Sequence, residues 1–341
     1  MTHTDDGSRI ACETIGVCQD VGAVVIGRNE GERLRRCLAS LAGEASQLVY
    51  VDSGSSDGSV ELALSLGAHV IPLDLAQPFT AARARNTGFR HLTQSATPPR
   101  YVQFVDGDCE VEAGWITAAQ TYLMSHAEAG VVFGRRRERF PETSIYNRLC
   151  DLEWDIAPGE CASCGGDAMM RVEALQSVGG YREDLIAGEE PELCVRLRQD
   201  GRKIVCLAQP MTIHDAAITR FSQWWRRAVR AGYSFAQGEH IHGGPPEHHK
   251  VVETRRAWIW GAGLPVAIIA GVGFFGPPAL LLSLIYPAQV ARLYLKRKKT
   301  MQYPFAASLF HVLGRFPEAL GQLKFQRDLL TGRTGKLIEY K

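Results

Sequence analysis

The first half of the chain alternates short apolar runs with stretches whose apolar residues recur at helical spacing. The apolar runs predict four buried strands, at residues 21–26, 48–51, 69–71 and 101–106. Leucines at helical spacing follow the first of these strands, and a segment rich in alanine and arginine, which favours a helix, precedes the fourth. Strands that alternate with helices predict an α/β fold with a mostly parallel sheet and helices on both faces.

The second half contains a long apolar stretch. Residues 257–291 carry no charged side chain over 35 positions, whereas one membrane span needs roughly 20 apolar residues. Pro277-Pro278 divides the stretch in two, and basic residues flank it at 255–256 and 296–299. This pattern predicts a two-pass or re-entrant membrane hairpin with both flanks in the cytoplasm. A buried helical hairpin in a soluble domain is the alternative.

The two patterns together predict five segments along the chain. These are a flexible tail over 1–20, an α/β domain over 21–240, a linker over 241–256, a membrane hairpin over 257–295 and an amphipathic helical segment over 296–341. Composition changes this picture little. The 38 basic and 37 acidic residues nearly balance, which argues against nucleic acid as a partner, and nine cysteines without framework spacing indicate reduced thiols.

Two carboxylates separated by one glycine, Asp106 and Asp108, end the fourth predicted strand. Two acids at the end of a buried strand are costly to desolvate unless a positive charge lies between them. A divalent cation with a preference for oxygen ligands supplies that charge. In open α/β sheets, ligands also bind beyond the carboxyl ends of the strands. The alternative is a simple turn, since Asp and Gly are both turn residues.

A polar loop, residues 52–59, follows the second predicted strand. It holds two acids, two glycines and four serines, and it opens a helix, so that its backbone donors and hydroxyls suit a nucleotide. It lacks the lysine of a phosphate-binding P-loop and the glycine spacing of a dinucleotide fingerprint. The sequence therefore favours a nucleotide held by carboxylates and a metal. A serine-rich turn that caps the next helix is the alternative interpretation.

The motifs occur in an order that resembles the family 2 glycosyltransferases with a GT-A fold. The segments that carry the resemblance are Asn29-Glu30, the loop 52–59, Ala84–Gly88, Asp106–Asp108, Cys164–Asp167 and Gly188–Leu197. The similarity covers about residues 21–215. It implies a GT-A, Rossmann-like, mostly parallel sheet with a C-terminal helical membrane-associated region. It also places the chain among bacterial enzymes of surface-glycan or exopolysaccharide assembly.

The resemblance implies a role for particular positions. Nucleotide-sugar binding falls to Asn29, Glu30, Asp52, Ser53, Asp57, Arg83 or Arg85, Asn86 and Asp106. The metal, Mg²⁺ or Mn²⁺, falls to Asp106, Asp108 and His214, and an imidazole ligand suits Mn²⁺ better than Mg²⁺. The acceptor side falls to Gly166, Asp167, Glu189 and Trp225.

Glu190 occupies the position of the family's catalytic base, which is usually an aspartate. The residue stands near the expected start of a helix, where the helix dipole favours the charged form of a carboxylate. We therefore expect Glu190 to be an ionised base at neutral pH. An acidic first helical turn without catalytic meaning is the alternative for this segment.

These roles imply an inverting enzyme that moves a sugar from a nucleotide-sugar donor to a hydroxyl of a glycan or lipid-linked acceptor. The implied location is the bacterial inner membrane, with the catalytic domain facing the cytoplasm. Two alternatives remain open: transfer to a polyprenyl phosphate, which needs no base, and a non-catalytic nucleotide-binding membrane protein of the same fold.

Overall fold

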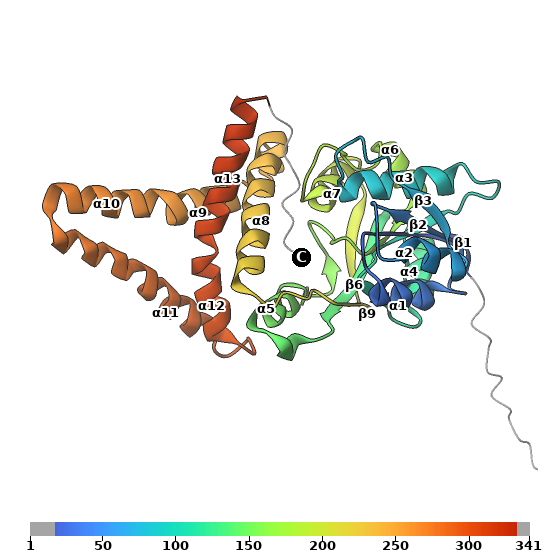
Figure 1. Cartoon of the computed structure of the whole chain (residues 1–341), viewed down its shortest axis with the longest axis horizontal. Helices are drawn as coiled ribbons and strands as arrows, with labels where there is room; N and C mark the ends of the chain where they lie inside the picture. The colour runs from blue at the N-terminus through green and yellow to red at the C-terminus, as the bar shows by residue number, and fades with distance from the viewer. Residues whose placement is uncertain (1–17, 333–341) are drawn as a thin grey trace, which may run out of the picture.

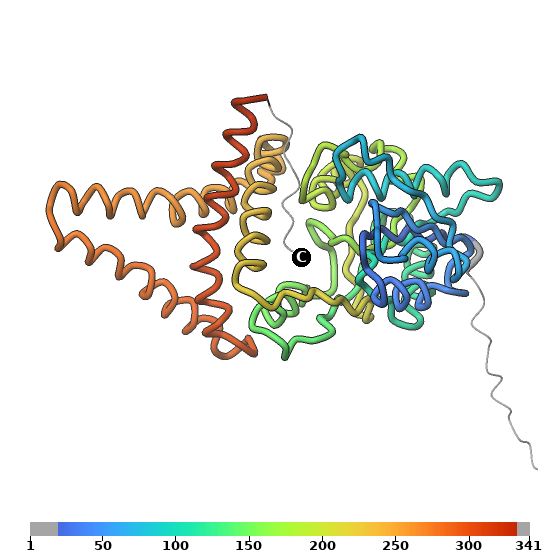
Figure 2. The backbone as a smooth tube through the Cα atoms, viewed as in Figure 1, coloured from blue at the N-terminus to red at the C-terminus, as the bar shows by residue number. Residues whose placement is uncertain are grey.

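The computed structural model describes residues 18–332, which form an α/β domain followed by long C-terminal helices (Figures 1 and 2). The strands are β1 (Cys18–Gly27), β2 (Ala45–Asp52), β3 (His69–Pro72), β4 (Tyr101–Asp106), β5 (Cys109–Val111), β6 (Ala129–Glu138), β7 (Gly159–Glu160), β8 (Ala168–Arg171) and β9 (Lys203–His214). The helices of this part are α1 (Glu32–Leu41), α2 (Ser59–Ser65), α3 (Ala81–Thr93), α4 (Trp115–Ser125), η1 (Pro141–Thr143), α5 (Ile145–Glu153), α6 (Val172–Ser177) and α7 (Glu189–Gln199). The four predicted strands correspond to β1–β4.

All the strands belong to one sheet, in the order β3-β2-β1-β4-β8-β6-β9-β5, with β7 paired to β9. The first four strands in this order are parallel, as the alternation of strands and helices predicts. In the other half, β8 runs antiparallel to both of its neighbours and β5 runs antiparallel to β9. Because β6 and β9 in this half are parallel to each other, the sheet as a whole is mixed, with parallel and antiparallel pairs. In Figure 1, α3, α6 and α7 lie on one side of the sheet, and α1 and α4 on the other.

The strand register brings the polar strand ends together. Asp106 ends β4 opposite the last residues of β1, and Asp52 ends β2 on the other side of β1. Across the mixed half, Cys109 of β5 pairs with His214 of β9, and Glu138 of β6 pairs with the same histidine. Since the interior of β1 and β4 is buried, these polar groups lie at one edge of the core.

The C-terminal part is helical. Its elements are α8 (Phe221–His242), α9 (Val251–Ala257), η2 (Trp258–Gly263), α10 (Leu264–Phe275), η3 (Pro277–Leu284), α11 (Ile285–Arg297), α12 (Pro304–Leu313) and α13 (Arg315–Leu330). In Figure 1, α10 and α11 project as a hairpin, and α8 and α13 stand between that hairpin and the sheet. The hairpin consists of two helical stretches, Val251–Phe275 and Pro277–Arg297, each long and apolar enough to cross a membrane. Only 6% and 0% of their apolar windows are buried.

Helix α13 packs against α8 at unusually short distance because both helices carry glycine at the crossing. A Cβ added at Gly232 of α8 would lie 2.0 Å from the carbonyl oxygen of Glu318, and one added at Gly321 of α13 would lie 2.0 Å from the carbonyl oxygen of Val229. Side chains of α13 such as Phe325 are buried in this contact. The predicted amphipathic segment thus packs one face of α13 on α8, while leucines such as Leu320 and Leu323 stay exposed on the other face.

Three predicted boundaries shift. Strand β1 begins at Cys18, so the predicted tail over 1–20 ends earlier, and residues 1–17 lie outside the described residues. Helix α8 extends to residue 242 and α9 begins at residue 251, so the predicted linker over 241–256 shortens to residues 243–250. The last part of the predicted amphipathic segment, 333–341, also lies outside the described residues.

Candidate active site

A cleft of about 600 Å³ lies at the carboxyl ends of β1 and β4, against the start of α7. Predicted site residues that line it are Asn29, Glu30, Arg85, Asp106, Asp108, Glu189, Glu190 and His214. Basic residues without a predicted role also line it: Arg28, Arg33 and Arg230. Strands far apart in the sequence and the N-terminus of α7 thus contribute to one cavity.

Arg85 is the centre of this cleft. Its guanidinium, only 3% exposed, lies 2.8 Å from Oδ1 of Asp106 and 2.9 Å from Oε1 of both Glu189 and Glu190. Burial alone would lower the pKa of Arg85, but the three carboxylates raise it well above its ordinary value. A buried charge of this kind is stable only when it is paired. Arg85 therefore ties the end of β4 to the start of α7.

Glu190 lies in the first turn of α7, as the sequence predicts, but its protonation differs from the prediction. Burial, followed by the neighbouring carboxylate of Glu189, raises the pKa of Glu190 to about 7, although Arg85 acts in the opposite direction. The helix dipole is too weak to offset these effects, since it is typically worth about 0.3–1 kcal/mol. Burial and Glu189 thus act against the ionised form that the helix start alone would favour.

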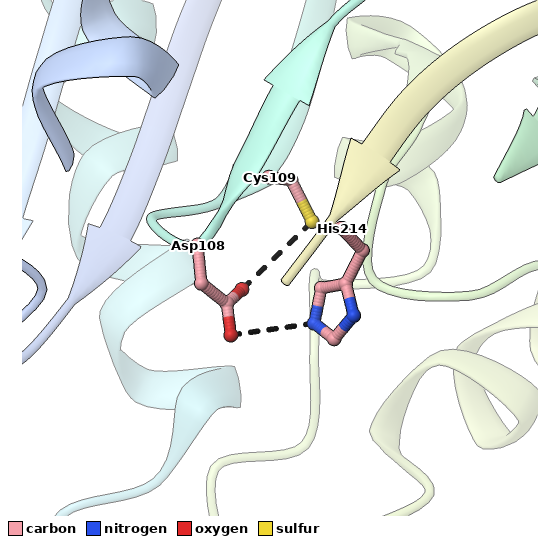
Figure 3. Close-up of side chains that lie close together, drawn as sticks. All are labelled: Asp108, Cys109 and His214. Atoms are coloured by element: carbon pink, nitrogen blue, oxygen red, sulfur yellow. Dashed lines mark hydrogen bonds and ion pairs between the residues drawn. The ribbon is translucent and has the colours of Figure 1, made fainter. Parts of the chain in front are cut away.

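The second predicted acid, Asp108, meets His214 across the β5–β9 pair. Nε2 of His214 lies 3.3 Å from Oδ2 of Asp108, and the thiol of Cys109 lies 3.8 Å from the other oxygen (Figure 3). Potential ligand atoms of the three residues lie within 4.8 Å of one another. Burial raises the pKa of the Cys109 thiol well above its ordinary value, which opposes the thiolate that metals bind. A carboxylate and an imidazole at this spacing fit a divalent ion such as Mn²⁺.

Behind His214 lies a carboxylate that the sequence did not indicate as part of the site. Oε2 of Glu138 is 3.9 Å from Nδ1 of His214, and that buried nitrogen has no hydrogen-bond partner among the described residues. The same carboxylate accepts a hydrogen bond from the backbone N–H of Ala216. Burial raises the pKa of Glu138. At 3.9 Å the carboxylate of Glu138 is close enough to attract a protonated His214, but it does not hold the ring through a hydrogen bond.

Asp167, predicted on the acceptor side, is instead a buried support. It is fully buried, and it accepts hydrogen bonds from the backbone N–H of Asp106 at 3.0 Å and from the hydroxyl of Thr212 at 2.7 Å. Arg136 of β6, which the sequence analysis missed, lies 2.8 Å from Asp167 and 3.9 Å from Asp106. With its oxygens committed in this way, Asp167 fixes the backbone of Asp106 and does not face an acceptor.

The loop 52–59 is organised by its own carboxylates. Asp52 accepts hydrogen bonds from the hydroxyl of Tyr50 and from the backbone N–H groups of Gly54 and Ser55, at 2.9–3.0 Å. Asp57 accepts from the backbone and hydroxyl of Ser59 and so begins α2, and the bond to that hydroxyl lowers the pKa of Asp57. The serine-rich turn, kept as an alternative for this loop, is therefore present before α2, but the N-cap residue of that helix is Gly58, without a side-chain cap.

Neighbours of this loop complete its scaffold. Oδ1 of Asn29 accepts a hydrogen bond from the backbone N–H of Ser56 at 2.7 Å, which joins the end of β1 to the loop. Ser53 is buried, and its backbone N–H donates to the carbonyl of Gly27. Glu30 forms an ion pair with Arg33 at 2.8 Å at the rim of the cleft. Of the predicted nucleotide-binding residues in this region, Asn29 and Glu30 line the cleft, whereas Asp52, Ser53 and Asp57 do not.

Three other predicted site residues, Arg83, Asn86 and Trp225, do not line the cleft. Arg83 donates to the backbone carbonyls of Asp74, Gln77 and Pro78, and so it holds a loop before α3. Of the two arginines left open, Arg85 lines the cleft and Arg83 does not.

Asn86 and Trp225 also lie outside the cleft. The side chain of Asn86 exchanges hydrogen bonds with the backbone of Tyr181, at 2.8 and 2.9 Å, which fixes the loop before α7. Trp225 packs against Phe221 and Trp224 on α8 and borders a surface depression next to α13. The predicted direct roles of Asn86 and Trp225 are not supported by these positions.

Residues 23–178 match the sequence model of the family described as Glycosyl transferase family 2. This part of the chain is therefore similar to the family 2 glycosyl transferases. Two curated relatives agree. A pre-mycofactocin glycosyltransferase of Mycobacterium tuberculosis is 28% identical over 230 residues, covering 64% of this chain and 47% of its own length. The succinoglycan biosynthesis protein ExoA of Rhizobium meliloti is 28% identical over 185 residues, covering 51% and 54%. The chain thus spans about half the length of these relatives.

A solved structure supports the same fold. The mannosyltransferase PcManGT from Pyrobaculum calidifontis, in complex with GDP-Man and Mn²⁺, has a TM-score of 0.58 at 19% identity, covering 89% of this chain and 87% of its own. At this identity the likeness concerns the fold, and the predicted GT-A class is confirmed.

We predict that Gly166 is required for the Arg85–Asp106 pair. A Cβ at this position would lie 2.6 Å from the guanidinium of Arg85 and 2.7 Å from Oδ2 of Asp106. Gly166→Ala should therefore displace the pair and weaken Mn²⁺ binding, measured by isothermal titration calorimetry, by about tenfold or more. Gly165→Ala is the matched control, because its nearest neighbour is 3.9 Å away. Equal affinities in the two variants would contradict the prediction.

Proposed function

We propose that this protein is a metal-dependent, inverting glycosyltransferase that moves a sugar from a nucleotide-sugar donor to a hydroxyl acceptor. The observation that carries the proposal is the single buried guanidinium of Arg85, which holds a metal-side acid, Asp106, and a base-side acid, Glu190, in one cleft. A scaffold without catalysis has no need of this costly arrangement, since each buried charge must be desolvated.

The acids near Arg85 favour a bound cation. The single guanidinium of Arg85 faces three carboxylates, those of Asp106, Glu189 and Glu190, and Asp108 adds a fourth acid to the same cleft. Asp108 and His214 are the residues that would hold Mn²⁺ or Mg²⁺, whereas Asp106, the third predicted ligand, pairs with Arg85. When bound, the ion neutralises negative charge that develops on the departing diphosphate. The structure of the mannosyltransferase with a similar fold contains GDP-Man and Mn²⁺, which supports a nucleotide-sugar donor and Mn²⁺ for this protein.

Glu190 is the proposed base. Its carboxylate lines the cleft and lies in the first turn of α7, and its pKa of about 7 suits a group that must release and accept protons at neutral pH. It takes the proton of the acceptor hydroxyl as that oxygen attacks the anomeric carbon. Direct displacement by one attacking oxygen inverts the anomeric configuration. Glu189 holds Arg85 and shapes the loop.

The apolar hairpin supports membrane association. We propose that it inserts into the bacterial inner membrane with both flanks, and so the catalytic domain, in the cytoplasm. The two apolar stretches leave large side chains such as Ile269 and Leu281 at 72% and 68% exposure, which water disfavours. The relative named for succinoglycan biosynthesis supports a role in cell-surface or exopolysaccharide assembly.

We predict that turnover requires a divalent cation held through Asp108. Nucleoside diphosphate release from a panel of sugar nucleotides should depend on Mn²⁺ or Mg²⁺, and Asp108→Asn should lower it by at least about a hundredfold. Glu112→Gln removes a carboxylate close in sequence that does not line the cleft, and this control should retain turnover. Full activity in excess EDTA would refute metal dependence.

We predict that the ionisation of Glu190 sets the acidic limb of the pH dependence of kcat/KM. Because its pKa is raised to about 7 and the base must be deprotonated, kcat/KM should fall as pH drops below about 7. Glu190→Gln should lower the rate by about a hundred- to ten-thousandfold and abolish this limb. Glu189→Gln, the matched control, should retain more activity. If Glu189→Gln is inactive while Glu190→Gln turns over normally, the assignment is reversed.

We predict that charge in the hairpin releases the protein from membranes. Ile269→Asp combined with Leu281→Asp should deplete the protein from alkali-washed membranes, since a charged residue at the centre of a span costs about 2.5–3.5 kcal/mol. Leu64→Asp, at a comparably exposed leucine of α2, should leave fractionation unchanged. Recovery of the wild-type chain wholly in the soluble fraction would rule out insertion.

A further inference from the structure

A basic cavity lies where the apolar hairpin joins the rest of the protein. It has a volume of about 460 Å³ and is bordered by α9, η2, α11, α12 and α13. Its ionisable lining is wholly basic: Arg256, Arg292, Lys296, Arg297, Arg315 and His311. No carboxylate lines it, although acidic residues are as common as basic ones in the whole chain.

Most of this positive charge is not compensated within the described part of the chain. Arg315 pairs with Glu318 at 2.7 Å, and Arg297 donates to the carbonyl of Ala307. Over residues 18–332, no carboxylate lies within ion-pair distance of the other three cations that line the cavity. Cations that line the cavity also act on His311. Burial, followed by the positive charges of Arg315, Arg297 and Arg256, lowers the pKa of His311 to about 4. The cavity therefore has a positive potential that suits an anion.

A middle chamber connects this basic cavity to the catalytic cleft. The middle chamber, about 620 Å³, shares Arg297, His311 and Arg315 with the basic cavity. At its other end it shares Gly188 and Arg230 with the cleft. Three neighbouring cavities that share lining residues thus lie between the base of the apolar hairpin and Gly188, the residue that precedes Glu189 and Glu190.

We propose that the basic cavity binds the phosphate of a lipid-linked sugar acceptor. The hydrocarbon chain lies along the exposed apolar hairpin, and the sugar lies in the middle chamber with one hydroxyl toward Glu190. Phosphate oxygens are well matched by arginine guanidinium groups. The proposal deepens the proposed function and rests on it for the acceptor role, while the binding of lipid phosphate stands on the cavity alone.

This placement decides which atom of the acceptor attacks. The basic cavity shares no lining residue with the cleft that contains Glu190, so a phosphate held there is not the nucleophile. A hydroxyl oxygen of the lipid-carried sugar forms the new bond to the donor's anomeric carbon. The bond from that carbon to the diphosphate oxygen breaks, the diphosphate leaves with the electron pair, and the hydroxyl proton passes to Glu190.

The test compares two charge-matched triple variants of the full-length chain in detergent. The first combines Arg256→Gln, Arg292→Gln and Lys296→Gln, which all line the basic cavity. The second combines Arg255→Gln, Lys298→Gln and Lys299→Gln, which lie close by in sequence but line none of the three cavities. Binding of a polyprenyl phosphate, of the uncharged polyprenol and of inorganic diphosphate is measured for each by native mass spectrometry, with thermal unfolding as the check on folding.

The first variant should lose polyprenyl phosphate affinity by about ten- to a hundredfold, and the second should stay within about twofold of wild type. The wild type should bind polyprenyl phosphate more tightly than polyprenol or inorganic diphosphate. Equal losses in both variants, or equal affinity for polyprenol, would overturn the proposal. Equal affinity for inorganic diphosphate would overturn the lipid source in favour of free phosphate. Affinity of the wild type for nucleoside diphosphates tests the proposed function separately.

Discussion

The site depends on one buried ion cluster. Arg85 is almost fully enclosed, and it binds Asp106 on the sheet and Glu189 and Glu190 on α7 at 2.8–2.9 Å. Without the guanidinium, three carboxylates would face one another with no compensating charge between them, and breaking a buried ion cluster typically costs about 3–5 kcal/mol. The same contact brings the metal-side acid and the proposed base into one cleft, so folding and chemistry rest on the same interaction.

The rest of the fold surrounds this cluster. The parallel strands β1, β2 and β4 bring their polar ends to one edge, while the antiparallel pairing of β5 with β9 brings His214 beside Asp108. On the other side of the cleft, α8 contributes Arg230 and packs backbone to backbone on α13 through Gly232 and Gly321. The wall of the catalytic cleft is therefore continuous with the helices that carry the apolar hairpin. This continuity connects sugar transfer in the cleft with an acceptor delivered from a membrane.

Local patterns predicted much of the fold but not its long-range pairing. The four apolar runs became β1–β4, and the predicted acids Asp106 and Asp108 line the cleft, because both depend on residues adjacent in sequence. The antiparallel strands of the second half depend on pairings between distant segments, which periodicity does not encode. Arg136 and Glu138 were missed for this reason, because their partners in the site, Asp167 and His214, lie far from them in the sequence.

Side-chain direction was the other limit. Arg83 and Arg85 are two positions apart on a helix, so they point to nearly opposite sides, and only the packed structure decides which one meets the cleft. The protonation of Glu190 could not be predicted either. Its place at a helix start was evident from the sequence, whereas the burial and the second carboxylate that raise its pKa are properties of the folded site.

The most direct test of the account is anomalous X-ray diffraction from crystals of the protein with Mn²⁺ and a nucleoside diphosphate. The account predicts one strong manganese peak in the cleft, coordinated by Asp108 and His214, with Arg85 still joining Asp106 to Glu190 and the diphosphate beside the metal. A manganese peak away from these residues, or an Arg85 detached from Glu190 when the nucleotide is bound, would contradict it.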